Sequence, residues 1–149
     1  QFPFRLSLVG GGPLHDDLVE RYGNSPTAPI QVKGPITDRT TLMRAYEQSD
    51  FFVFPTQHEG FPRVLYEAMI KSTLVFTTMV GGIPGLMQPD KNCIAIPGGS
   101  ASAIADAIVQ TSSKPAHMQR IVDAALDTVI DVLTKHPTHL LALRKELDA

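Results

Sequence analysis

Short apolar runs alternate with amphipathic stretches along the whole chain. The apolar runs are about five residues long and rich in Val, Ile, Leu and Phe, which predicts buried strands. They lie at 5–10, 30–34, 50–54, 73–77 and 92–96. The stretches between them carry apolar residues at a spacing of three or four, which predicts helices. The first helix runs from Pro13 to about Tyr22, the second from Thr37 or Asp38 to near Ser49, and the third from Gly60 onward. From Ser100 onward the pattern is helical again. Pro137 interrupts it, and a last short helix follows to about Leu147.

Strands that alternate with helices through short loops predict an α/β fold. The expected architecture is a Rossmann-like parallel sheet with helices on both faces. In such sheets ligands bind outside the carboxyl ends of the strands. Four loops follow strands and are therefore expected to line one crevice: 10–12, 34–37, 55–60 and 78–85.

Composition narrows the class of protein. A chain of 149 residues, 43% hydrophobic, is long enough for one domain with its own core, spanning residues 1–149. A net charge of −2 without a basic block predicts no nucleic-acid partner. The longest apolar run is too short for a transmembrane segment. The single cysteine, Cys93, excludes an internal disulfide and favours a reducing, cytoplasmic location, and its apolar setting predicts a buried thiol that behaves as a small hydrophobe.

Several familiar motifs fail on their spacing. The glycine run 10–12 is followed by His15 where a dinucleotide fingerprint has its third glycine, so a plain tight turn is favoured and a nucleotide contact at Gly11 is the alternative. The pair His58-Glu59 begins like a zinc-protease helix, but Pro62 stands where the second histidine would be. The other histidines have no metal-binding spacing, and there is no phosphate loop and no serine nucleophile elbow. No metal is expected.

Two acidic residues, Glu59 and Glu67, lie eight positions apart where a strand turns into a helix. If the helix begins after Gly60, the two acids are separated by roughly 12 Å along it. Free backbone N–H groups at the helix N-terminus suit a phosphate. An acid, an anion site and a second acid in a row suit a nucleotide-sugar. The alternative is that Glu59 caps the helix and Glu67 is a solvated charge on its outer face.

The run from Glu59 to Met69, EGFPRVLYEAM, resembles the E-x7-E signature of retaining glycosyltransferases of family four, which have the GT-B fold. Further matches follow in the family's order and together cover about residues 4–110. They are LVGGGP at 8–13, VKG at 32–34, the stretch from Ala45-Tyr46 to DFFVFP at 50–55, and Thr77-Thr78 followed by GGIP at 81–84.

This resemblance implies the C-terminal, donor-binding half of a two-domain enzyme. Glu59 would be the catalytic residue, contacting the transferred sugar, and Glu67 would hold the ribose. Backbone amides from Gly60 through Phe61 to Arg63 would lie near the diphosphate, and the backbone at Ile36 would contact the base. Gly81 and Gly82 would lie beside the sugar. Such enzymes stabilise an oxocarbenium-like transition state electrostatically, without a metal or other cofactor.

Three departures from the family pattern stand out. Gly85 replaces the usual glutamate after GGxP, which puts the contact of that loop in doubt. Pro62 replaces a common glycine and removes one N–H, which a helix start tolerates. The strand that bears the diphosphate-binding arginine and lysine is not among these residues, so an interruption of the sheet is expected between the strands at 4–10 and 50–54.

The implied partners are a nucleotide-sugar donor and, through an N-terminal domain, an acceptor sugar or lipid-linked sugar. Peripheral membrane association is compatible with this function. The 149 residues alone are predicted to be inactive. Two alternatives stay open: a nucleotide-sugar epimerase of GT-B fold and a non-catalytic nucleotide-sugar-binding module.

Overall fold

The computed structural model describes residues 3–23, 29–60 and 62–135. The chain divides into two compact units, Gln1–Leu42 and Met43–Ala149. The last helix predicted after Pro137 lies outside the described residues. The strands form two parallel sheets, β1-β2 and β3-β4-β5, so the interruption expected between the strands at 4–10 and 50–54 is confirmed.

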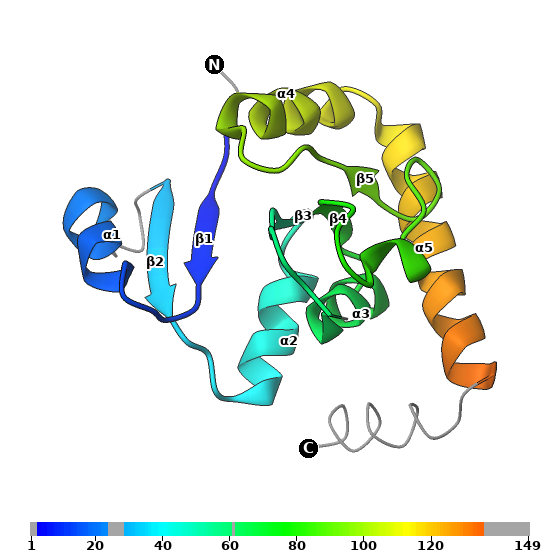
Figure 1. Ribbon diagram of the computed structural model, residues 1–149, viewed down its shortest axis with the longest axis horizontal. Helices are drawn as coiled ribbons and strands as arrows, with labels where there is room; N and C mark the ends of the chain where they lie inside the picture. The colour runs from blue at the N-terminus through cyan, green and yellow to red at the C-terminus, as the bar shows by residue number, and fades with distance from the viewer. Residues whose placement is uncertain (1–2, 24–28, 61, 136–149) are drawn as a thin grey trace. The chain divides into compact units, whose positions relative to one another are not determined.

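The first unit is built on two parallel strands, β1 (Leu6–Val9) and β2 (Ile30–Gly34). Helix α1 (His15–Tyr22) connects them and lies beside β2 (Figure 1). Val32 is buried, whereas most of β1 is exposed and α1 buries none of its residues.

The turn after β1 differs slightly from the prediction. Gly10 and Gly12 adopt φ of 143° and 147°, a conformation that favours glycine. The helix was predicted to begin at Pro13, and this prediction is wrong. The His15 N–H donates to the Gly12 carbonyl at 3.1 Å, which makes residues 12–15 a turn, and α1 begins at His15.

Helix α2 (Arg39–Glu47) begins where its polar start signal predicts. Of the two candidate caps, Asp38 has the capping bond, because its Oδ2 accepts from the Thr41 N–H at 2.7 Å. Met43 and Tyr46 are buried near the C-terminal end of this helix.

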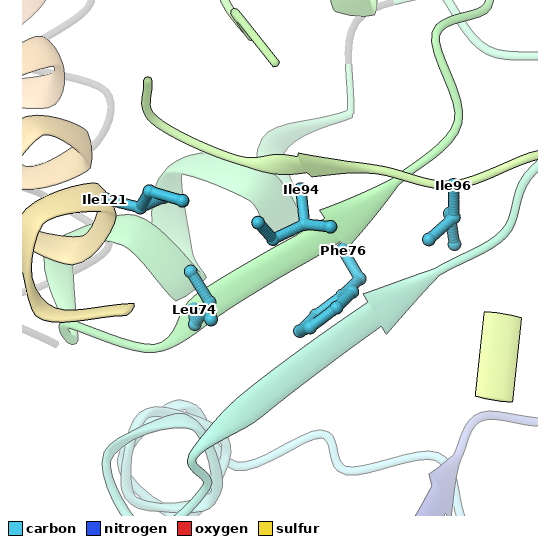
Figure 2. Packing of buried hydrophobic residues seen from close by; sticks show 5 residues of the cluster. All are labelled: Leu74, Phe76, Ile94, Ile96 and Ile121. Atoms are coloured by element: carbon cyan, nitrogen blue, oxygen red, sulfur yellow. The ribbon is translucent and has the colours of Figure 1, made fainter. Parts of the chain in front are cut away.

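The second unit is built on β3 (Phe51–Phe54), β4 (Leu74–Thr77) and β5 (Ile94–Ala95), with β4 central and fully buried. Figure 2 shows Leu74, Phe76, Ile94 and Ile96 gathered on one face of this sheet, with Ile121 reaching them from α5 (Pro115–Lys135). Apolar residues of α4 (Ala101–Ser112) pack against the same cluster.

The opposite face of this sheet is covered by α2 and α3 (Arg63–Ile70). Adjacent residues of a strand point to opposite faces. Accordingly the Phe51 ring packs on Phe76, at 5.2 Å between centroids, whereas the Phe52 ring packs on Tyr46 of α2, at 5.3 Å. Leu65 and Met69 of α3 are fully buried. The predicted parallel sheet with helices on both faces is confirmed.

The long helical pattern after Ser100 is two helices rather than one. Ser100 caps α4 by accepting from the Ala103 N–H at 3.3 Å. The helix ends at Ser112, and α5 starts at Pro115, a residue suited to a first helical position because it has no N–H to satisfy. Residues 110–117, QTSSKPAH, contain no large apolar residue, and the prediction did not assign this polar stretch as a break.

Candidate functional site

Glu67 lies on α3 and is buried, with 6% of its surface exposed. The Tyr46 hydroxyl donates a hydrogen bond to its Oε2 at 3.2 Å. A buried acid with a side-chain donor is not a solvated charge on an outer face, so that alternative is wrong. The carboxyl group is held in one place by α3 on one side and by α2 on the other.

Glu59 lies in the loop between β3 and α3 and is half-buried. Together with its neighbours it lines an open hollow of about 380 Å³, formed by Gln57, His58, Glu59, Gly60 and Gly81. The N-cap residue of α3 is Pro62 and not Glu59, and the Pro62 side chain makes no capping bond. The alternative in which Glu59 caps the helix is therefore wrong also.

Helix α3 begins later than predicted, at Arg63. The Arg63 side chain is exposed. Pro62 is extended, with ψ of 116°, and its carbonyl accepts from the Leu65 N–H at 3.3 Å. Because only part of the segment between Glu59 and Glu67 is helical, the 12 Å estimate does not apply to the pair. Phe61 lies outside the described residues.

The loop after β4 lies directly against the Glu59 loop. Gly81 has a φ of +57°, and a Cβ built on it would overlap the Glu59 carbonyl oxygen. The Gly82 N–H donates to the Gly60 carbonyl at 2.8 Å. Gly81 lines the hollow, and the N–H of Gly82 is already engaged. The contacts of both glycines with a sugar stay predictions.

Two candidate residues belong to the first unit. Gly11 is exposed, and a Cβ built on it would lie 3.7 Å from Pro35 Cδ. The Gly10 N–H donates to the Gly34 carbonyl at 2.9 Å, so the loops after β1 and β2 lie side by side within this unit. Ile36 follows in the second of these loops and is half-buried. The contacts of Gly11 and Ile36 with a nucleotide stay predictions.

Burial governs the chemistry of Cys93. The side chain is fully buried just before β5, as predicted. Burial, together with the nearby charge of Asp90, raises the pKa of the Cys93 thiol to about 12, so the thiol is protonated at neutral pH and a poor nucleophile. Burial also raises the pKa of Tyr66 on α3.

Candidate metal ligands are dispersed: within residues 3–23, 29–60 and 62–135, no group of three or more His, Cys, Asp or Glu side chains is placed to hold a metal ion. Nor does any helix in those ranges combine the length and apolar character required to cross a membrane.

Three features of this region escaped the sequence analysis. Gln57 and His58 line the hollow, although nothing in their spacing marks them. The bond of Tyr46 to Glu67 joins residues 21 positions apart. The Thr78 hydroxyl donates to the Thr56 carbonyl at 2.6 Å, another contact between distant segments. Local periodicity carries no signal for such pairings.

Comparison with known proteins shows the family to which the chain is related. The model of the family described as "Glycosyl transferases group 1" matches residues 1–114. The chain is 32% identical over 125 residues, 82% of its length, to TuaC of Bacillus subtilis (strain 168), a glycosyltransferase assigned to teichuronic acid biosynthesis. It spans only 16% and 29% of the length of curated relatives that it matches.

Solved structures show the same fold. A sucrose-phosphate synthase from Thermosynechococcus elongatus matches 96% of this chain, and 38% of its own, with a TM-score of 0.75 at 24% identity. Anabaena Alr3699/HepE in complex with UDP-glucose matches 93% of this chain, and 41% of its own, with a TM-score of 0.68 at 20% identity.

Proposed function

The chain belongs to the group 1 glycosyl transferase family, and from this premise we propose that it is the donor-binding part of a retaining glycosyltransferase of family four. The enzyme would move a sugar from a nucleotide-sugar to an acceptor sugar or lipid-linked sugar and retain the anomeric configuration. The chain would supply the residues that hold the donor.

The observation that carries this proposal is the setting of Glu59. The half-buried acid opens onto a hollow, and the N-terminus of α3 follows four residues later at Arg63. A carboxyl group suits sugar hydroxyls and a developing positive charge, and the N-terminus of a helix suits a diphosphate. Both groups of a nucleotide-sugar thus find a chemical complement within one short segment.

Glu67 would bind the ribose. Its carboxyl group is buried and hydrogen-bonded by Tyr46, so it is already oriented before a ligand arrives. Preorganisation lowers the cost of binding, because less side-chain freedom is lost. The hydroxyl groups of a ribose would donate to the carboxyl oxygens.

In the proposed reaction the bond between the anomeric carbon and the diphosphate oxygen breaks, and its electron pair leaves with the nucleoside diphosphate. The acceptor hydroxyl oxygen then bonds to the anomeric carbon, and its proton passes to the diphosphate oxygen that has left. Glu59 would stabilise the positive charge that develops on the sugar, and the amides of Gly60 and Arg63 the charge on the diphosphate. No metal or other cofactor is required in this scheme.

Similarity to a nucleotide-sugar-binding protein supports this scheme. Alr3699/HepE, which shares the fold, has been crystallised in complex with UDP-glucose. We propose that the present chain binds a donor of the same chemical class.

Calorimetry on the 149-residue chain tests the ribose contact. We would titrate UDP and GDP, and then the 2′-deoxy form of whichever nucleotide binds, into the wild-type chain and into Glu67→Gln. The wild type should prefer the ribonucleotide about tenfold, the equivalent of one good hydrogen bond, and Glu67→Gln should lose that preference. Glu20→Gln, at an exposed position on α1, is the control. Absence of binding of both nucleotides at millimolar concentration would contradict the proposal.

A second experiment concerns the reaction itself. The chain alone should transfer no sugar, since it covers less than a third of the curated relatives that it matches. Nucleotide binding should persist in EDTA. Turnover by the isolated chain, or an effect of EDTA on binding, would contradict these expectations. Isomerisation of the donor without any acceptor would instead favour an epimerase.

A further inference from the structure

The Glu59 loop and the loop after β4 touch at three points: one before Glu59, one after it and one at Glu59 itself. Before it, the Thr78 hydroxyl donates to the Thr56 carbonyl at 2.6 Å. After it, the Gly82 N–H donates to the Gly60 carbonyl at 2.8 Å. Between them, the Cα of Gly81 lies against the peptide group of Glu59 itself.

The Gly81 contact is the most restrictive of the three. A Cβ on this residue would overlap the Glu59 carbonyl oxygen and lie 2.9 Å from its carbonyl carbon. These are backbone atoms, so they cannot rotate away as the end of a side chain would. Any side chain at Gly81 must therefore displace the Glu59 peptide or the loop after β4.

Thr78 reinforces this contact from a buried position. Only 2% of its surface is exposed, and it follows directly after the central strand β4. The preceding residue, Thr77, donates in the same way to the Phe54 carbonyl at 3.2 Å. The interior of the sheet thereby fixes the loop after β4, and that loop fixes the Glu59 loop.

We propose that Gly81 and the Thr78 hydroxyl are positioning residues for Glu59. Gly81 permits the close approach that sets the Glu59 backbone, and Thr78 holds the start of the loop. The structural part of this inference stands on the contacts alone. Its consequence for sugar binding rests on the proposed function.

Three alanine substitutions separate the steric contact from the backbone conformation. Gly81→Ala introduces both the overlap with Glu59 and a side chain at positive φ. Gly99→Ala introduces a side chain at positive φ, +77°, into open space, and Gly85→Ala introduces neither cost. All three changes add the same single methyl group.

The structural readout is the pair of backbone amide signals of Glu59 and Gly60 in a ¹⁵N-labelled 149-residue chain. Gly81→Ala should shift both signals, whereas Gly99→Ala and Gly85→Ala should leave them in place. Equal spectra of Gly81→Ala and Gly85→Ala at these two amides would overturn the proposal. This comparison needs no ligand, so it is informative even if the proposed function is wrong.

Thr78→Val and Thr78→Ser provide a second, milder test in case Gly81→Ala does not fold. The valine keeps the branched shape and removes the donor, and the serine keeps the donor. Thr78→Val should shift the amide signals of Glu59 and Gly60, and Thr78→Ser should leave them at their wild-type positions. Equal shifts in both variants would show that the hydroxyl has no positioning role.

The ligand readout is the gain in affinity of a nucleotide-sugar over its nucleoside diphosphate, measured with UDP-glucose against UDP and GDP-mannose against GDP. Gly81→Ala should reduce this gain about tenfold, the loss of roughly one hydrogen bond. A full gain in Gly81→Ala would overturn the positioning of Glu59 for a sugar. If the wild type binds none of the four ligands, the proposed function fails while the amide shifts still decide the structural role.

Discussion

The two glutamates of the candidate site are held in contrasting ways. Glu67 lies on a helix, is buried, and has a side-chain partner in Tyr46. Glu59 is half-buried in a loop whose place is set through backbone atoms, by contacts at Thr56, Gly60 and its own peptide group. One acid is fixed through its side chain and the other through its main chain.

Because of this difference, the Glu67 carboxyl group is the more rigidly held and the Glu59 carboxyl group is the more accessible to a ligand. A buried carboxyl group with a fixed donor can offer a ribose a preoriented acceptor, but replacing it disturbs the core. A carboxyl group at the rim of a hollow can contact a sugar that changes shape during reaction, and replacing it leaves the fold intact. Glu67 should therefore report on both stability and binding, and Glu59 on the sugar alone.

The largest expected effect is a difference in stability between Glu67→Ala and Glu59→Ala. Glu67→Ala removes an acceptor from the buried Tyr46 hydroxyl and should lower the free energy of unfolding by about 2 kcal/mol. Glu59→Ala should change it by less than about 0.5 kcal/mol. Urea denaturation followed by circular dichroism measures both. Equal losses in the two variants would remove the contrast.

Tyr46→Phe tests the side-chain half of the comparison with a smaller change. The ring keeps its edge-to-face contact with Phe52, and only the hydroxyl is lost. Unfolding free energy should fall by about 1 kcal/mol, and the preference of the chain for ribose over 2′-deoxyribose should weaken. The double variant Tyr46→Phe, Glu67→Gln should show less than the sum of the single effects, since both remove one interaction. Strict additivity would mean that the bond does not orient Glu67.

The smallest effect concerns Cys93, a buried group without a proposed role at the site. Its pKa of about 12 lies above the ordinary value of 9.0, so the folded state favours the protonated thiol. That contribution to stability is fully present below pH 9 and is lost as the pH rises from 9 toward 12. Iodoacetamide at pH 8 should therefore modify the native chain far more slowly than the urea-unfolded chain. Equal rates would show that the thiol is accessible.

The sequence was most informative where structure is set locally. The strand at Ile30–Gly34 has the predicted bounds, and the Asp38 cap of α2 is among the two candidates expected, because both depend on near neighbours. The break between α4 and α5 also had a local signal, because Pro115 at a helix start follows a run of polar residues, and the prediction left that signal unused.

The arrangement around Glu59 was beyond such reasoning. Positive φ at Gly81 is a local property that a glycine-rich loop suggests. Its contact with Glu59, 22 positions earlier, depends on how β3 and β4 pair, and no periodicity encodes that. The burial of Glu67 is similar, since an acid on a helix normally indicates a solvated face. Family resemblance identified both residues, and the fold supplied the reasons for their positions.

The Gly81 contact also has a consequence for the order of folding. Helix α3 and strand β4 lie between Glu59 and Gly81 in the chain, so we expect the two loops to meet only after β3 and β4 have paired. Contacts that form after the transition state affect the rate of unfolding and leave the rate of folding nearly unchanged. A substitution at Gly81 would then open the native state faster without slowing its formation. The hollow beside Glu59 would be among the last parts of the second unit to assemble and among the first to be lost.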